Sequence, residues 1–181
     1  MRVAALLGCG LFVVIVARES DAHRLDEYLQ ATRIAVTTNR LELTFELTPG
    51  AAVAEPVIEL LDPDRDGRVA GDEGTAYAQR FLKDLHLGLD GKAVALSVTA
   101  ATFPALHEIR SGTGVIRIRG TSMVGPLEAG SHSLTLTNRH LPAISVYLVN
   151  ALQSRDSAVE IGRQTRDNLQ TSYRLEFRVR P

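Results

Sequence analysis

The sequence predicts a mainly β, sandwich-like domain with a helix–loop–helix inserted between its second and third strands. After residue 22, most of the chain alternates apolar and polar residues in period two, with Gly, Pro and Asn between the alternating segments. One segment, at about residues 53–86, departs from this period, because its apolar residues recur at helical spacing on both sides of an acidic stretch. Together these patterns predict two sheets and one helical insertion.

The composition is that of one globular domain. The 181 residues are 45% apolar and 23% charged, with a formal net charge of −1. This balance excludes a disordered chain and leaves enough apolar surface for one core. Lys and Arg are scattered along the sequence, so we expect no nucleic-acid-binding face.

Residues 1–22, "MRVAALLGCGLFVVIVARESDA", are typical of a secretory signal peptide. A basic Arg2 precedes an apolar run, and small residues stand at Ser20 and Ala22, the −3 and −1 positions of a cleavage site. We expect cleavage near Ala22 and a single exported domain, residues 23–181, in the periplasm or secreted.

Two alternatives to cleavage are an uncleaved membrane anchor and a lipid anchor at Cys9. The apolar run, Val3–Ala17, is shorter than the roughly 20 residues that span a bilayer. No second apolar stretch of spanning length follows, so we expect no membrane span in the mature chain.

The strands are predicted in chain order from alternation and turn residues. Segments 31–39 and 40–48 meet at Asn39, which predicts a hairpin. Residues 85–98 predict two strands joined by an Asp90-Gly91 turn, because this dipeptide accepts positive φ. Four more segments complete the sandwich: residues 114–120, 132–138, 144–152 and 173–179.

Two helices are predicted around the acidic stretch. Residues 51–61 predict a short helix, with Pro56 tolerated near its first turn. Residues 74–87 predict a second helix. Its apolar stripe is Ala76, Tyr77, Phe81, Leu82 and Leu85, and its outward residues are Gln79, Arg80 and Lys83.

The stretch "LDPDRDGRVAGDE", Leu61–Glu73, concentrates carboxylates that repel one another. Three aspartates alternate, a glycine follows, and a glutamate comes seven residues after the last aspartate. A hard cation explains this spacing, because Ca²⁺ takes about six to eight oxygen ligands at flexible distances. Magnesium demands stricter octahedral geometry and is the second choice.

The pattern D-x-D-x-D-G-x₅-E resembles the calcium loop of the EF-hand family, over about residues 53–86. The resemblance implies that Gly67 makes the sharp turn and that Val69 turns toward the core. It also implies the ligands: side-chain oxygens of Asp62, Asp64, Asp66 and Glu73, and the backbone carbonyl of Arg68.

The loop departs from the family pattern in two ways. Ala70 has no side-chain oxygen at position 9, so water takes that place. EF-hands usually occur in pairs and no second loop follows, so we expect weak affinity, on the order of 10⁻⁴–10⁻³ M. We expect the ion to hold the helices to the sheets rather than to act as a regulatory signal. The alternative interpretation is a solvated Asp-rich turn.

Histidines supply a different hypothesis. Cleavage after Ala22 makes His23 the N-terminus, and its α-amine and imidazole together can chelate copper or nickel. The remaining histidines have no ligand-like spacing: His86, His107, His132 and His140.

Two short stretches resemble the exported domains of bacterial nickel/cobalt-transporter and hydrogenase/urease-accessory permeases. They are "AHRLDEYL", Ala22–Leu29, and "NRHLPAISVYLVNAL", Asn138–Leu152. The resemblance implies a transition-metal carrier or an accessory subunit of a metal permease. Because no permease helices follow in this sequence, it implies a freestanding relative that acts beside a separate permease.

Enzyme motifs are absent from the sequence: there is no G-x-S-x-G, no HExxH and no phosphate-binding glycine loop. Ser131-His132-Ser133 is interpreted as a turn entry, and the Asn138, Arg139 and His140 cluster as ordinary loop polarity. A further set is interpreted as a solvated face: Asp156, Arg163, Arg166 and Asp167.

The expected function is therefore that of an exported, non-enzymatic binding or interaction module that binds calcium. A permease or another exported protein is the expected partner. The alternative is a carrier of nickel, cobalt or copper.

Overall fold

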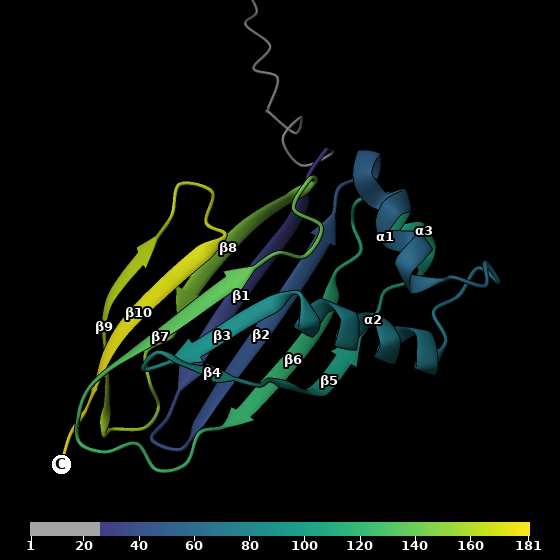
Figure 1. Cartoon of the computed structure of the whole chain (residues 1–181). Helices are drawn as coiled ribbons and strands as arrows, with labels where there is room; N and C mark the ends of the chain where they lie inside the picture. Colours follow the sequence, from purple (N-terminus) through teal and green to yellow (C-terminus); the bar gives the residue numbers. More distant parts are fainter. Residues whose placement is uncertain (1–25) are drawn as a thin grey trace, which may run out of the picture.

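The computed structural model describes residues 26–181, which form two five-stranded β-sheets. The inner faces of the sheets share one hydrophobic core, and the helices lie together on one side of the sheets, at the right in Figure 1. The prediction of a mainly β fold with two sheets is confirmed. The predicted signal peptide and His23 lie outside the described residues.

The first sheet has the strand order β5-β6-β2-β1-β8. Its neighbouring strands are antiparallel except for β1 and β8, which are parallel. The strands are β1 (Tyr28–Val36), β2 (Arg40–Pro49), β5 (Ser97–Thr102), β6 (Ile116–Met123) and β8 (Ser145–Ala151).

The second sheet has the order β4-β3-β7-β10-β9 and is antiparallel throughout. Its strands are β3 (Leu85–Leu89), β4 (Lys92–Val94), β7 (Gly130–Asn138), β9 (Val159–Arg166) and β10 (Ser172–Val179).

Both predicted hairpins are confirmed. Strands β1 and β2 pair up to Val36 opposite Leu41, around a turn that contains Asn39. Strands β3 and β4 pair around the two-residue Asp90-Gly91 turn, where φ is +51° and +77°. Positive φ at both central residues suits the right-handed twist of the flanking strands.

Alternation places one face of most strands in the core. In β2 every second side chain is fully buried, as at Leu41, Leu43, Phe45 and Leu47. Burial of each such side chain stabilises the fold by about 1.5–3 kcal/mol. The sequence pattern therefore selects which face of the strand points inward.

The second strand of the pair predicted in residues 85–98 is shorter than expected, although the hairpin itself is confirmed. Strand β4 ends at Val94, and the chain then crosses to the first sheet, where β5 begins at Ser97. Alternation continues through the crossing, so the period does not reveal it. Strand pairing shows where the chain changes sheet, because Val94 lies opposite Leu87 of β3 while Ser97 lies opposite Thr121 of β6.

Two elements of the structure were not predicted. Strand β9 is an edge strand whose residues are mostly polar and exposed, so alternation there is weak. Helix α3 (Leu106–Arg110) is a single short turn with only Leu106 and Ile109 buried.

Two longer helices, α1 (Ala54–Leu61) and α2 (Gly71–Lys83), lie between β2 and β3. A 3₁₀ turn, Ala51–Val53, leads into α1, and Pro56 stands in its first turn as expected.

The buried face of α2 differs from the predicted stripe. The helix ends at Lys83 and Leu85 lies in β3, while Ala76 is exposed. The two largest side chains of the stripe, Tyr77 and Phe81, are buried as predicted. The Phe81 ring packs edge-on against the Phe45 ring, with 4.9 Å between the ring centroids.

Candidate metal centre

The acidic loop connects the end of α1 to the start of α2 and extends away from the sheets, at the far right in Figure 1. Asp62 directly follows α1, and its N–H donates to the Ile58 carbonyl at 2.9 Å. The Asp62 side chain is only 4% exposed. The first of the predicted ligands is thus anchored in the body of the protein.

Three predicted ligands are brought together. One carboxylate oxygen from each of Asp62, Asp64 and Asp66 lies within 4.8 Å of the other two. Asp64 and Asp66 are exposed. Among residues 26–181, these are the residues whose acidic or imidazole groups converge closely enough to hold a metal ion.

Backbone N–H groups of the loop donate to these carboxylates. Asp62 accepts from Asp66 and from Gly67, each at 3.0 Å, through its two different oxygens. Asp64 also accepts from the Asp66 N–H at 3.1 Å, and Asp66 accepts from the Arg68 N–H at 2.9 Å. These bonds wind the loop tightly, which keeps the alternate side chains on one side.

The winding requires left-handed backbone at two positions. Gly67 has φ +87° and Arg65 has φ +62°. Glycine takes this conformation without steric cost, so Gly67 stands where the turn needs it.

Glu73, in the first turn of α2, lies outside the three-aspartate group. Its Oε2 accepts a hydrogen bond from the Ala70 N–H at 2.8 Å. Its Oε1 is buried and has no hydrogen-bond partner among the described residues. Buried carboxylate oxygens normally have partners, so this atom is the unusual feature of the loop.

Arg68 and Val69 follow the turn at Gly67. The side chain of Arg68 is exposed. Val69 is half-buried and packs against the core, as the resemblance implied.

The four described histidines occupy separate places. His86 and His107 are exposed. His132 contacts the Asp90 carboxylate at 2.7 Å and the Glu128 carbonyl at 2.9 Å, one with each ring nitrogen. The His132 ring is therefore fully hydrogen-bonded. Transition-metal binding through His23 stays a prediction, because His23 lies outside the described residues.

The interpretation of Asn138 and His140 as loop polarity is wrong. Their exposed fractions are 2% and 0%, whereas Arg139 is exposed. The Asn138 amide donates to Gln30 at 2.8 Å, and the Gln30 amide donates to the His140 carbonyl at 3.0 Å. The sequence did not predict this network, because polar residues at the end of a strand are usually exposed. They are buried only where distant parts of the fold supply hydrogen-bond partners.

Two tyrosines extend the network. The Tyr77 hydroxyl lies 3.2 Å from His140 Nε2 and 2.5 Å from the Tyr28 hydroxyl. Burial lowers the pKa of His140, although the nearby Asp84 carboxylate opposes the shift. Burial also raises the pKa of Tyr28 and of Tyr77, so the three groups stay neutral at ordinary pH.

Two further polar side chains, one in a loop and one in β9, join the sheets. The Asp156 carboxylate accepts hydrogen bonds from the N–H and the hydroxyl of Thr38, both at 2.9 Å. The Arg166 guanidinium donates to the Val149 carbonyl. Asp156 and Arg166 belong to the four residues that were interpreted as a solvated face. Instead, these two join β9 and the loop before it to the first sheet.

Within the described part of the chain, no helix is long and apolar enough to cross a membrane. Comparison with protein-family models finds no matching family, and comparison with curated proteins finds no matching relative.

Proposed function

We propose that the Asp62–Glu73 loop binds one calcium ion, and that the protein is a non-enzymatic binding module whose fold this ion stabilises. In this proposal α1, the loop and α2 act as a single EF-hand-like unit. The observation that carries the proposal is the convergence of three aspartate carboxylates within 4.8 Å.

Charge repulsion supports a bound cation. Two unit negative charges 4.8 Å apart repel by about 1 kcal/mol in water and by roughly 3.5 kcal/mol at the lower effective dielectric of a protein surface. The loop hydrogen bonds hold the carboxylates in place against this repulsion. A divalent cation at their centre changes the interaction from unfavourable to favourable.

Glu73 supports the proposal independently. Its Oε1 is buried and has no partner within residues 26–181. Leaving an acceptor unsatisfied costs about 1–3 kcal/mol, and more for a charged group. We propose that a change of rotamer brings the Glu73 carboxylate to the ion, and that this movement draws the start of α2 toward the aspartates.

The donor set fits calcium better than other metals. Every proposed ligand atom is an oxygen, from the side chains of Asp62, Asp64, Asp66 and Glu73 and from the carbonyl of Arg68. Hard oxygen ligands suit calcium and magnesium, whereas copper, nickel and zinc favour imidazole or thiolate. Calcium accepts more variable coordination geometry than magnesium, which favours calcium for ligands that come from one short loop.

The test is a calcium titration of residues 23–181 by calorimetry, with the melting temperature followed in parallel. We expect one equivalent to bind at sub-millimolar to millimolar calcium and to raise the melting temperature. Glu73→Gln should weaken binding by at least about tenfold, because it removes a charged ligand.

Asp72→Asn is the matched control. Asp72 is an exposed neighbour of Glu73 and falls at a position of the loop that supplies no ligand. Equal weakening in both variants would show that general negative charge, not a built site, attracts the ion. Absence of binding in the unmodified protein would overturn the proposal.

A further inference from the structure

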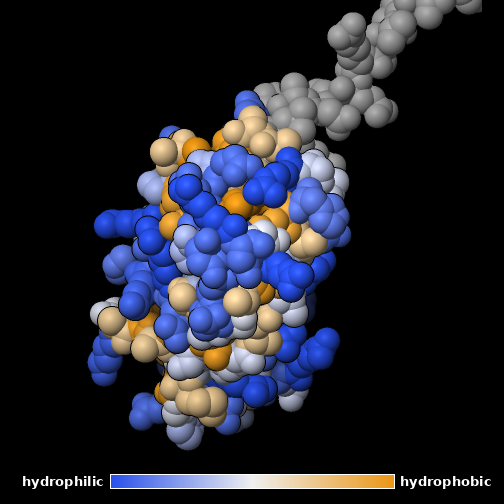
Figure 2. All heavy atoms as spheres, turned by 90° about the vertical axis from the view of Figure 1, so that its right-hand side faces the viewer, coloured by the Kyte–Doolittle hydropathy of each residue, from blue (hydrophilic) through white to orange (hydrophobic). Residues whose placement is uncertain are grey.

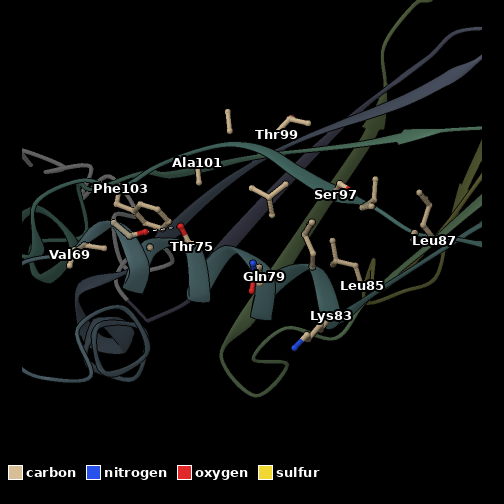
Figure 3. A pocket seen from close by; sticks show the side chains of 18 of the residues that line it. Val69, Thr75, Gln79, Lys83, Leu85, Leu87, Ser97, Thr99, Ala101 and Phe103 are labelled. Atoms are coloured by element: carbon tan, nitrogen blue, oxygen red, sulfur yellow. Dashed lines mark hydrogen bonds between the residues drawn. The ribbon is translucent and has the colours of Figure 1, made fainter.

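A groove of about 830 Å³ runs between helix α2 and the chain from β4 to β5. Figure 3 shows α2 on one side, carrying Thr75 and Gln79, and β5 on the other, carrying Ser97 and Ala101. This size lies in the range of pockets that hold ligands, roughly 300–1,000 Å³. In Figure 2, which views the helical side of the molecule, hydrophobic residues form separate patches among hydrophilic ones.

The groove follows the edge of β5 rather than one of its faces. Consecutive residues from Val94 to Ala101 all line it. Successive side chains of a strand point to opposite faces, so a hollow on one face would be lined by alternate residues only. The groove is therefore open to the backbone of β5.

The backbone edge that faces the groove is unpaired in the described residues. Strand β5 is the last strand of its sheet, with β6 as its one neighbour. No turn or loop within residues 26–181 donates a backbone hydrogen bond to β5 or accepts one from it. Free N–H and C=O groups along an edge are a template for another extended strand.

Charge does not protect this edge. Residues 93–103 contain no charged side chain, although 23% of the chain is charged, whereas exposed edges often carry charged residues. A register shift between Val98 and Ala100, and Pro104 after the end of β5, limit pairing to a short partner strand. The opposite side of the sandwich is closed: Gln164 of β9 accepts from the Ala151 N–H, and Arg166 donates to the Val149 carbonyl.

We propose that this groove binds an extended segment of a partner protein, which adds a strand to the free edge of β5. Alternate apolar side chains of that segment pack against Leu82 and Phe103 in the groove. Main-chain hydrogen bonds provide affinity in this mode, and the pockets for alternate side chains provide specificity. Lys83 is the one charged residue that lines the groove, which favours an acidic group at that end of the peptide.

The space fits a single strand better than a second copy of the protein. Helix α2 lies along β5, so the groove is bounded on both sides (Figure 3). A second copy would have to bring its own edge strand together with the helix beside it. The proposal is independent of metal binding by the acidic loop.

The test starts with the protein that begins at His23. Peptides that bind it are selected from a library of random octapeptides displayed with free carboxyl ends. We expect the selected peptides to alternate Val, Ile or Thr with other residues. On binding, the amide protons of residues 97–102 that point away from β6 should exchange at least about tenfold more slowly. N-methylation of alternate peptide nitrogens should weaken binding at least about tenfold, because it removes donors and keeps the side chains.

A matched pair of variants locates the site. Thr75 and Ala76 are adjacent exposed residues of α2, and only Thr75 lines the groove. Thr75→Arg should weaken peptide binding about tenfold, whereas Ala76→Arg should leave it unchanged. A library without binders overturns the proposal, as does a selected peptide insensitive to both N-methylation and Thr75→Arg. A dimer in sedimentation that Thr75→Arg dissociates would overturn it in favour of self-pairing.

Discussion

The Asp84 carboxylate lies 2.7 Å from Nδ1 of the buried His140 ring, and this contact joins the end of α2 to the connection between β7 and β8. With Nδ1–H donating to Asp84, the Nε2 atom of His140 accepts from Tyr77 at 3.2 Å. Tyr77 in turn lies 2.5 Å from the hydroxyl of Tyr28 in β1. The row of four side chains thus holds the helix that begins at the candidate metal loop.

Tyr77→Phe removes the central hydroxyl of this row. It leaves His140 Nε2 and the Tyr28 hydroxyl buried without their partner, so we expect a loss of about 1–3 kcal/mol in the free energy of unfolding. Urea denaturation measures this. Tyr173→Phe is the control, because the Tyr173 hydroxyl bonds to one half-buried partner, Gln164, instead of joining two buried groups. Equal losses in the two variants would contradict a special role for the buried row.

The pair Asp90 and His132 predicts a pH-dependent contribution to stability. The hydrogen bond to Asp90 raises the pKa of His132, with burial opposing and the Glu128 carbonyl assisting. Burial raises the pKa of Asp90, but hydrogen bonds from His132 and the Ser133 N–H outweigh it, so that pKa is lowered overall.

The sign follows from the raised pKa of His132. The stabilisation from the pair is fully present below the pKa of His132 in the unfolded chain, about 6.5. It is lost as pH rises through the pKa of His132 in the folded protein. We expect Asp90→Asn to cost up to about 1 kcal/mol at acid pH and progressively less at alkaline pH. Urea unfolding at about pH 5.5 and pH 9 measures the difference. A cost that stays constant over this range would rule out the charged pair.

Gly67→Ala tests the left-handed turn of the loop. No atom lies within 4 Å of an added Cβ, and φ is +87°, so strain alone should cost about 1–2 kcal/mol. Gly71→Ala is the control: it also meets open space, but without positive φ. At the start of α2 it should be neutral or stabilising by up to about 1 kcal/mol. Melting temperatures that shift in the same direction would contradict this difference.

Arg166→Met opens the closed side of the sandwich. The guanidinium donates to the Val149 carbonyl at 3.0 and 2.5 Å, and lies 5.2 Å from the centre of the Tyr173 ring. We expect a loss of about 1.5–3 kcal/mol from the charged hydrogen bonds. Arg163→Met, at an exposed position of the same strand, should cost less than about 0.5 kcal/mol. Unfolding in urea compares the two, and similar losses would show that the guanidinium contacts contribute nothing specific.

Much of the fold was predictable because it depends on local patterns. Alternation predicted β1 and β2, and the Asp90-Gly91 dipeptide predicted the turn at its correct position. Strand β9 was missed because an edge strand need not alternate, and the crossing at Ala95–Leu96 was missed because alternation runs through it.

The sequence by itself determined the spacing of carboxylates in the acidic loop, because the positions of side chains on one tightly wound loop depend on local order alone. It also determined the inward face of most strands, since period two follows from backbone geometry. Only the tertiary structure decided that Asn138 and His140 are buried. It also decided that β5, beside α2, has no strand partner on its outer side within residues 26–181. Those properties depend on residues far apart in the chain, and local sequence carries no record of which distant segments pair.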